Sequence, residues 1–331
     1  MIAEPLYPLS FEPYFQYRLW GGRALGDFMS ATLPGEDPIG EAWVLSDRDD
    51  VSSRVRNGPL AGRTIGELMT RRKADILGAD AGRFARFPLL LKFLDVERML
   101  SVQVHPRDDQ TELIPPGDTG KTEAWVVLRA KPGARIYAGL QPGTTAEDLK
   151  TLTRASADQR LARLSPKPGE GVMIEAGTVH CLGDGVMVFE VQENSDVTFR
   201  LYDWDHVDAK TGKLRPLQVD QALKSIDFGR GPVQPVEPWA VADGQPQAEP
   251  VFRNSHFDLS RWRGEAPFPV GAEGQARVLV CVDGAGRIEA GTAPTPFRRG
   301  NVLLLPAAVG RAEAVPDGPT TILEIAIPEA A

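Results

Sequence analysis

Polar side chains alternate with valines in one short segment of the chain. Ser101, Gln103 and His105 are separated by Val102 and Val104. Because a β-strand directs successive side chains to opposite faces, the three polar groups would share one face. A strand that carries Gln and His on its inward face, in place of Leu and Ile, indicates the wall of a polar cavity.

Two more potential ligands lie further along the chain. Glu123 follows Lys121 by two residues at the start of a second β-rich run, so these two charges also share a face. His180 closes a Gly-Thr-Val-His segment shortly after another apolar run. Imidazole, carboxylate and amide groups are suitable donors for a divalent metal, with one position left for water or substrate. The candidate metal ligands are therefore Gln103, His105, Glu123 and His180.

These residues could instead have a purely structural role. A histidine in a strand is usually an ordinary core or surface residue, and a Gln-x-His pair has little specificity. The chain has only four histidines, at positions 105, 180, 206 and 256. His105 and His180 both lie beside Gly or Pro at the ends of strand-like runs, which favours a site without excluding the structural explanation.

Cationic residues near these positions are candidates to bind an anion. In the run TFRLYD, alternation places Arg200 on one face with Thr198 and Tyr202. A guanidinium that points toward a metal suits an anionic group, but the pattern alone favours the alternative, a surface arginine on a strand. Lys121, as a point charge, and Ser101, as a donor, are further candidates for binding an anion.

Five segments, taken in order, resemble the type I phosphomannose isomerases (mannose-6-phosphate isomerases), which are metal-dependent cupins. The resemblance extends from about residue 11 to residue 228, at spacings like those of the short bacterial branch. Several separated motifs in the right order are far more specific than any one of them. The segments are FEPYFQYRLWGGRAL, LSVQVHP, GKTEAW, AGTVHCLGDG and SDVTFRLYDWD.

The resemblance implies a role for each candidate residue. Gln103, His105, Glu123 and His180 would hold one Zn²⁺ per chain, and Gln103 stands where general cupins have a histidine. Arg200 and Lys121 would be catalytic, and both would contact substrate together with Ser101. Glu175 replaces the proline that is usual in the second cupin motif, a change that does not move the ligand His180.

The elements that would position these residues are mostly strands. The resemblance implies a cupin (jelly-roll) β-barrel with helical insertions, and we assign residues 1–235 to this metal-binding catalytic domain. Helical patterns occur over 64–85, where Thr64 and Glu67 form a possible capping box, and over 145–164, with Leu161 and Leu164 on its apolar stripe. Residues 11–43 are predicted to be loop-rich.

The C-terminal part of the chain repeats features of the first. Residues 227–243 contain the prolines and glycines of a linker. The segment GNVLLLP at 300–306 follows the pattern of GVMIEA at 171–176, and Arg311 falls near the position corresponding to His180. We therefore predict a degenerate cupin-like barrel over 244–331, without metal ligands.

Composition restricts the partners. The net charge of −8 argues against nucleic acid, because a phosphate backbone requires a basic surface. The two cysteines do not predict a disulfide framework, and no apolar run approaches the ~20 residues of a membrane span. We expect a cytoplasmic protein with a small phosphosugar substrate, no membrane partner, and a monomeric or weakly dimeric state.

The resemblance makes an aldose–ketose isomerase the leading hypothesis, one that converts mannose 6-phosphate to fructose 6-phosphate through an enediol. Two alternatives are a non-catalytic sugar-phosphate- or metal-binding cupin regulator and a 2-His-1-carboxylate Fe(II) oxygenase. The sequence does not rank the groups that would transfer the proton. These are Lys121, a water on the metal, Glu41 and His206.

Overall fold

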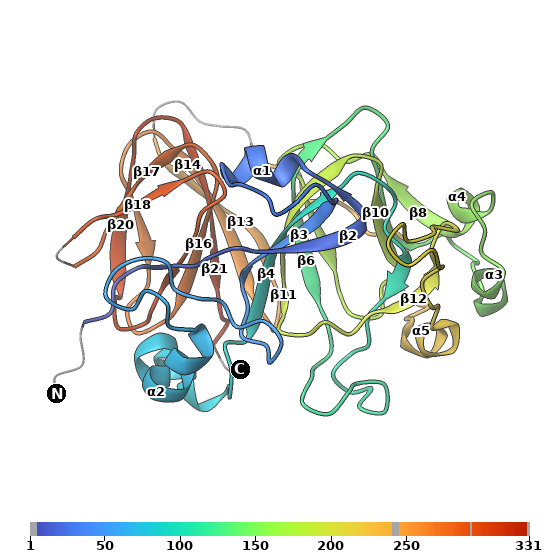
Figure 1. The fold of residues 1–331 in the computed structure, drawn as a ribbon, viewed down its shortest axis with the longest axis horizontal. Helices are drawn as coiled ribbons and strands as arrows, with labels where there is room; N and C mark the ends of the chain where they lie inside the picture. The colour runs from blue at the N-terminus through green and yellow to red at the C-terminus, as the bar shows by residue number, and fades with distance from the viewer. Residues whose placement is uncertain (1–4, 240–244, 292, 330–331) are drawn as a thin grey trace.

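The computed structural model describes residues 5–239, 245–291 and 293–329. They form four antiparallel sheets that stack in order, with helices at the margins (Figure 1). Sheets 1 and 2 enclose the candidate site, and sheets 3 and 4 form the C-terminal barrel. This architecture confirms the mainly β, jelly-roll prediction. Every helix in these residues is too short or too polar to cross a bilayer.

Sheets 1 and 2 contain all the strands described between residues 14 and 202. Sheet 1 has the strand order β12 (Phe199–Tyr202), β5 (Val102–Val104), β10 (His180–Gly183), β7 (Arg135–Leu140), β8 (Leu161–Leu164). Sheet 2 has the order β2 (Tyr14–Gly22), β3 (Ile39–Leu45), β4 (Leu89–Val96), β11 (Val186–Glu193), β6 (Glu123–Ala130), β9 (Gly171–Ile174).

Sheets 3 and 4 come mainly from the C-terminal part. Sheet 3 has the order β1 (Leu9–Ser10), β19 (Val302–Leu305), β16 (Arg277–Asp283), β21 (Thr320–Ala326), β14 (Asp258–Gly264), β13 (Gln247–Arg253). Sheet 4 has the order β15 (Phe268–Gly271), β20 (Arg311–Pro316), β17 (Ala285–Glu289), β18 (Thr295–Arg298). Strand β1 pairs with β19, so the start of the described chain completes a C-terminal sheet.

Sheet 2 is buried on both faces, and the period of two in its strands explains how. In β4, Leu91 and Phe93 belong to an apolar core shared with sheet 3. Leu94, on the opposite face, packs into the core shared with sheet 1. Lys92 lies on the same face as Leu94 and lines a cavity between sheets 1 and 2. One face of this strand therefore stabilises the joint with the C-terminal barrel while the other builds the candidate site.

Helices flank the core between sheets 2 and 3 and cover the outer side of sheet 1. The elements α1 (Ala24–Met29), α2 (Ile65–Leu77) and η1 (Ala79–Gly82) contribute to or flank the core between sheets 2 and 3. Helix α5 (Val219–Ser225) packs on β12 and β5 of sheet 1 (Figure 1). The short helices α3 (Ala146–Lys150) and α4 (Ala157–Arg160) lie near β8 at the far end (Figure 1).

The capping box predicted at the start of α2 is confirmed. Thr64 Oγ1 accepts a hydrogen bond from the Glu67 N–H at 3.1 Å, and Glu67 Oε2 accepts one from the Thr64 N–H at 2.9 Å. We expect Thr64→Ala to lower the free energy of unfolding by about 1 kcal/mol, because it leaves a helix N–H unsatisfied. Urea unfolding followed by circular dichroism measures this change. A loss no larger than that of the exposed Thr151→Ala control would contradict it.

Two local predictions are wrong. Residues 161–164 form strand β8 instead of helix, because Leu161 and Leu164 pair with Leu140 and Ile136 of β7 and are supported by that sheet. Residues 11–43 are not loop-rich, since β2 and α1 lie there, whereas β3 confirms the strand expected over residues 40–46. Gly21 sits inside β2 because a Cβ built on it would lie 2.3 Å from the Gly40 nitrogen, so only glycine allows the strands to approach.

The two cysteines are free and buried, as expected. The domain division at 1–235 and 244–331 stays a prediction. Of the predicted linker, residues 240–243 lie outside the described residues, as does residue 244.

Candidate metal centre and active-site cavity

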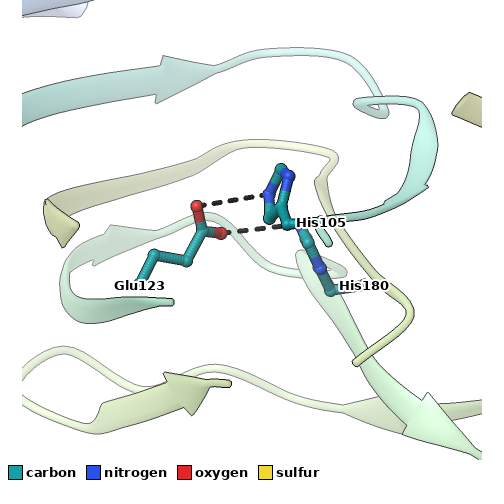
Figure 2. A group of neighbouring side chains, drawn as sticks. All are labelled: His105, Glu123 and His180. Atoms are coloured by element: carbon teal, nitrogen blue, oxygen red, sulfur yellow. Dashed lines mark ion pairs between the residues drawn. The ribbon is translucent and has the colours of Figure 1, made fainter. Parts of the chain in front are cut away.

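The candidate ligands come from both sheets that enclose the site. Gln103 in β5 pairs with His180, the first residue of β10, and His105 follows β5 directly. Glu123 begins β6 on the facing sheet. The Nε2 atoms of His105 and His180 each lie 3.4 Å from one oxygen of the Glu123 carboxylate (Figure 2). Residues separated by up to 77 positions in sequence thus converge within a buried space.

Both imidazoles are oriented by backbone carbonyls. Nδ1 of His105 lies 2.7 Å from the Val197 oxygen, and Nδ1 of His180 lies 2.9 Å from the Thr178 oxygen. If each Nδ1–H donates there, each Nε2 presents a lone pair toward Glu123. Burial, and then the charge of Lys121, lowers the pKa of His105 to about 3, and burial also lowers the pKa of His180. Neutral imidazoles are the form that binds metals.

Gln103 contacts this group through one of the two histidines. Its amide nitrogen lies 3.1 Å from His180 Nε2, and its amide oxygen accepts a hydrogen bond from Ser101 Oγ at 3.0 Å. Because the two amide atoms can exchange places by a half-turn, the oxygen can face the imidazoles while the nitrogen donates to Ser101. Glu123 Oε1 has no hydrogen-bond partner among the described residues, which leaves it free to bind a cation. The donor set fits a divalent metal.

Lys121 lies against this group. Its Nζ is 2.6 Å from Glu123 Oε2 and 3.3 Å from His105 Nε2. Burial favours the neutral amine, but the adjacent carboxylate outweighs it and raises the pKa of Lys121. Burial likewise opposes ionisation of Glu123, yet the charge of Lys121 holds the pKa of that carboxyl well below its ordinary value. The pair is therefore ionised in the buried site.

A cavity of about 470 Å³ opens beside the cluster, between sheets 1 and 2. Gln103 and Lys121, which contact the histidines, line it, and so does Ser101. Its walls carry five cationic and four anionic side chains, which makes it far more polar than a protein core. The charged residues are Arg18, Lys92, Lys121, Arg200 and Arg215, with Glu41, Glu190, Asp196 and Asp208.

Arg200 presents unused donor capacity to this cavity. It lies opposite Gln103 across the β12–β5 pairing. Its Nε has no hydrogen-bond partner among the described residues, although the atom is buried. Burial, and then the nearby charge of Arg215, lowers the pKa of Arg200. A guanidinium in these surroundings is ready to bind an anion.

Lys92 and Glu190 belong to the cavity but were not identified from the sequence. They face each other from β4 and β11 at 3.5 Å, and both are buried. Lys92 also lies 3.6 Å from Asp196, and Trp125 Nε1 donates to Glu190 at 3.0 Å. The sequence signal for this pair is a single charged residue inside each of two apolar runs, LLLKFL and VMVFEV. A buried charge usually requires a partner of opposite charge, so each of these two charges could have been expected to have one.

Of the groups left unranked as proton carriers, Lys121 and Glu41 line the cavity and His206 does not. Glu41 accepts hydrogen bonds from Arg18 Nε at 2.8 Å and from Trp43 Nε1 at 2.7 Å. Although burial opposes ionisation, Arg18 and Lys92 lower the pKa of Glu41 to about 2. Glu41 is therefore a fixed anion at neutral pH.

This shift predicts an acid-dependent contribution to stability. Because the pKa of Glu41 is about 2 in the folded protein and near 4.5 unfolded, its stabilisation is complete above pH 4.5 and is lost as the pH falls toward 2. We expect Glu41→Gln to cost about 3 kcal/mol at pH 7 and progressively less below pH 4.5. Urea titrations of both proteins between pH 7 and pH 3 measure the difference, and a constant gap across this range would refute it.

Comparisons with known proteins agree with this geometry. Residues 9–133 match the family model "Phosphomannose isomerase type I, catalytic domain". Mannose-6-phosphate isomerase ManA of Bacillus subtilis is 34% identical over 316 residues, which cover 94% of this chain and 95% of the relative. A mannose-6-phosphate isomerase of Streptococcus mutans is 30% identical over 93% of this chain and 94% of its own length. The crystal structure of a B. subtilis mannose 6-phosphate isomerase superposes with a TM-score of 0.84 at 27% identity, over 97% of this chain and 99% of that one.

Proposed function

The chain belongs to the type I phosphomannose isomerase family, and from that premise we infer that it interconverts mannose 6-phosphate and fructose 6-phosphate. The observation that carries this inference is the buried His105–Glu123–His180 group, which meets a highly charged cavity through Gln103 and Lys121. Homologues named as isomerases over nearly the whole chain favour catalysis over the non-catalytic regulator and over the Fe(II) oxygenase.

We propose that Gln103, His105, Glu123 and His180 hold one Zn²⁺. Two neutral imidazoles, one amide and one carboxylate are donors that this ion accepts, and the set leaves it a net positive charge. The bound ion would act as a Lewis acid toward the vicinal oxygens of the open-chain sugar. The hydrogen bonds from the two histidines to backbone carbonyls preorganise the ligands, because they fix both ring orientations.

The cavity side chains account for the rest of the reaction. Isomerisation moves a proton between C1 and C2, and negative charge develops on the C1 and C2 oxygens in the enediol stage. We propose that Lys121 and Arg200 stabilise this charge and contact substrate, and that Ser101 donates to it. Lys92 and Glu190 extend the polar wall next to them. The five cations of this cavity outnumber its four anions, although the chain as a whole carries a charge of −8, and this local excess suits a phosphosugar.

A deuterium experiment tests the proposal directly. Zinc-loaded protein is incubated with mannose 6-phosphate in D₂O, and the products are followed by NMR. We expect fructose 6-phosphate to form and deuterium to appear at the carbon that exchanges its proton through the enediol. Tight binding of mannose 6-phosphate without turnover would contradict the proposal and favour the regulator. Turnover of another phosphosugar alone would retain the isomerase chemistry but correct the substrate.

A further inference from the structure

We propose that Asp108, Glu193 and His256 form a second divalent-cation site, separate from the isomerase cavity. One potential ligand atom from each residue lies within 4.8 Å of the others. The three residues come from different segments: the loop between β5 and β6, the end of β11, and the turn between β13 and β14. No sequence motif connects them, and only the fold brings them together.

The ligand atoms are held in place by backbone groups. Glu193, with 7% of its surface exposed, accepts a hydrogen bond from the Thr122 N–H through Oε1 at 2.7 Å, and its Oε2 lies 3.2 Å from His256 Nδ1. Asp108 Oδ1 accepts a hydrogen bond from the Gly120 N–H at 2.8 Å. One oxygen of each carboxylate is thus anchored, as the outer hydrogen bonds of a metal site anchor its ligands.

The surroundings leave room and net negative charge for an ion. A cavity of about 440 Å³ contains all three residues, and none of its lining residues lines the isomerase cavity. Arg107 and Arg230 also line it, but they are paired elsewhere. Arg107 lies 3.1 Å from Asp109, and Arg230 binds Glu175. The negative charges of Asp108 and Glu193 are therefore not offset by these arginines.

The donor set indicates the class of ion. One imidazole and two carboxylates are a mixed N/O set of the kind that Zn²⁺ and Co²⁺ accept, and the exposed side of the cavity allows water to complete the shell. The ion would join the C-terminal barrel, through His256, to the loop that carries Lys121. It would also stabilise the end of β11, because the Glu193 N–H donates to the Thr122 oxygen at 3.1 Å. We therefore expect the ion to stabilise the contact between the C-terminal barrel and the loop that carries Lys121.

Zinc stoichiometry tests the site independently of catalysis. Metal-free full-length protein is titrated with ZnCl₂ by calorimetry, and bound metal is measured after gel filtration. We expect the wild type to bind a second equivalent that His256→Ala and Asp108→Asn fail to bind, whereas His105→Ala retains it. His206→Ala is the control, since this residue belongs to neither cluster and lines neither cavity, and it should keep the two equivalents.

Thermal unfolding provides a second readout and checks that each variant folds. The second equivalent should raise the Tm of the wild type and of His105→Ala, because an ion that binds only the folded state stabilises it. It should not raise the Tm of His256→Ala. A wild type that binds one equivalent only, or a His256→Ala protein that still binds two, overturns the proposal. Either outcome leaves the isomerase assignment intact, since that depends on a different cluster.

Discussion

Glu123→Gln is expected to abolish tight zinc binding at the His105–Glu123–His180 cluster and to lower kcat/KM by about three orders of magnitude or more. Glu123 is the one anion among the proposed ligands, and both of its oxygens face imidazole nitrogens at 3.4 Å. Loss of a Lewis acid worth several kcal/mol of transition-state stabilisation corresponds to a rate loss of about this size, at ~1.4 kcal/mol per factor of ten. Metal analysis and a coupled isomerase assay measure the two effects.

The same substitution has a separate consequence for the metal-free protein. Lys121 is buried 2.6 Å from Glu123, so the neutral amide would leave the ammonium without its closest anion. We expect a loss of about 3–5 kcal/mol in unfolding free energy, the usual result of removing one partner from a buried pair. Adding Lys121→Met should recover part of it, which a double-mutant cycle in urea measures.

Controls separate these effects from general damage. Glu147→Gln, on an exposed helix, should change neither zinc content nor stability. Retention of the full wild-type zinc content by a folded Glu123→Gln protein would remove Glu123 from the ligand set. Loss of zinc with full isomerase activity would instead remove the metal from the mechanism.

The local pattern of the sequence was sufficient for the elements that carry the ligands. Alternation in the segment from Ser101 to His105 correctly predicted a strand, β5, and put Gln103 and His105 on one face. The start of α2 followed from Thr64 and Glu67 alone, because a capping box involves only residues three apart. These features depend on near neighbours, so they can be predicted without knowledge of the fold.

Features that depend on distant pairing could not be predicted in this way. Leu161 and Leu164 fit a helical stripe, but they form strand β8 because they pair with β7 at the edge of sheet 1. The ion-pair partner of Lys92 could not be predicted, because Glu190 lies opposite it only through the pairing of β4 with β11. His256 has no motif nearby, and its approach to Glu193 depends on how sheet 3 packs against sheet 2. In each case the partner is tens of residues away.

Replacement of Arg200 should separate charge stabilisation from metal binding. Arg200→Lys keeps a positive charge but loses the planar fork of donors, and Arg200→Ala loses both. Because Arg200 lies opposite Gln103 and its buried Nε is unpaired among the described residues, we expect it to bind charge that develops during the reaction. Arg200→Ala should lower kcat by about 10²–10³-fold, as when a donor to a developing oxyanion is removed.

Whether the Arg200 substitutions change kcat or KM shows which part of the substrate Arg200 binds. Stabilisation of the enediolate predicts a fall in kcat with little change in KM, whereas a ground-state contact to the phosphate predicts a rise in KM with kcat preserved. Zinc content should stay at the wild-type level in both variants, which distinguishes them from Glu123→Gln.

Arg215→Lys is the matched control. Arg215 lines the same cavity, but its Nε already donates a hydrogen bond to Asp203 at 2.7 Å, so its substitution should lower kcat less. An equal loss of kcat in Arg215→Lys and Arg200→Lys would mean that the cavity requires only its total positive charge, and would refute a specific role for Arg200.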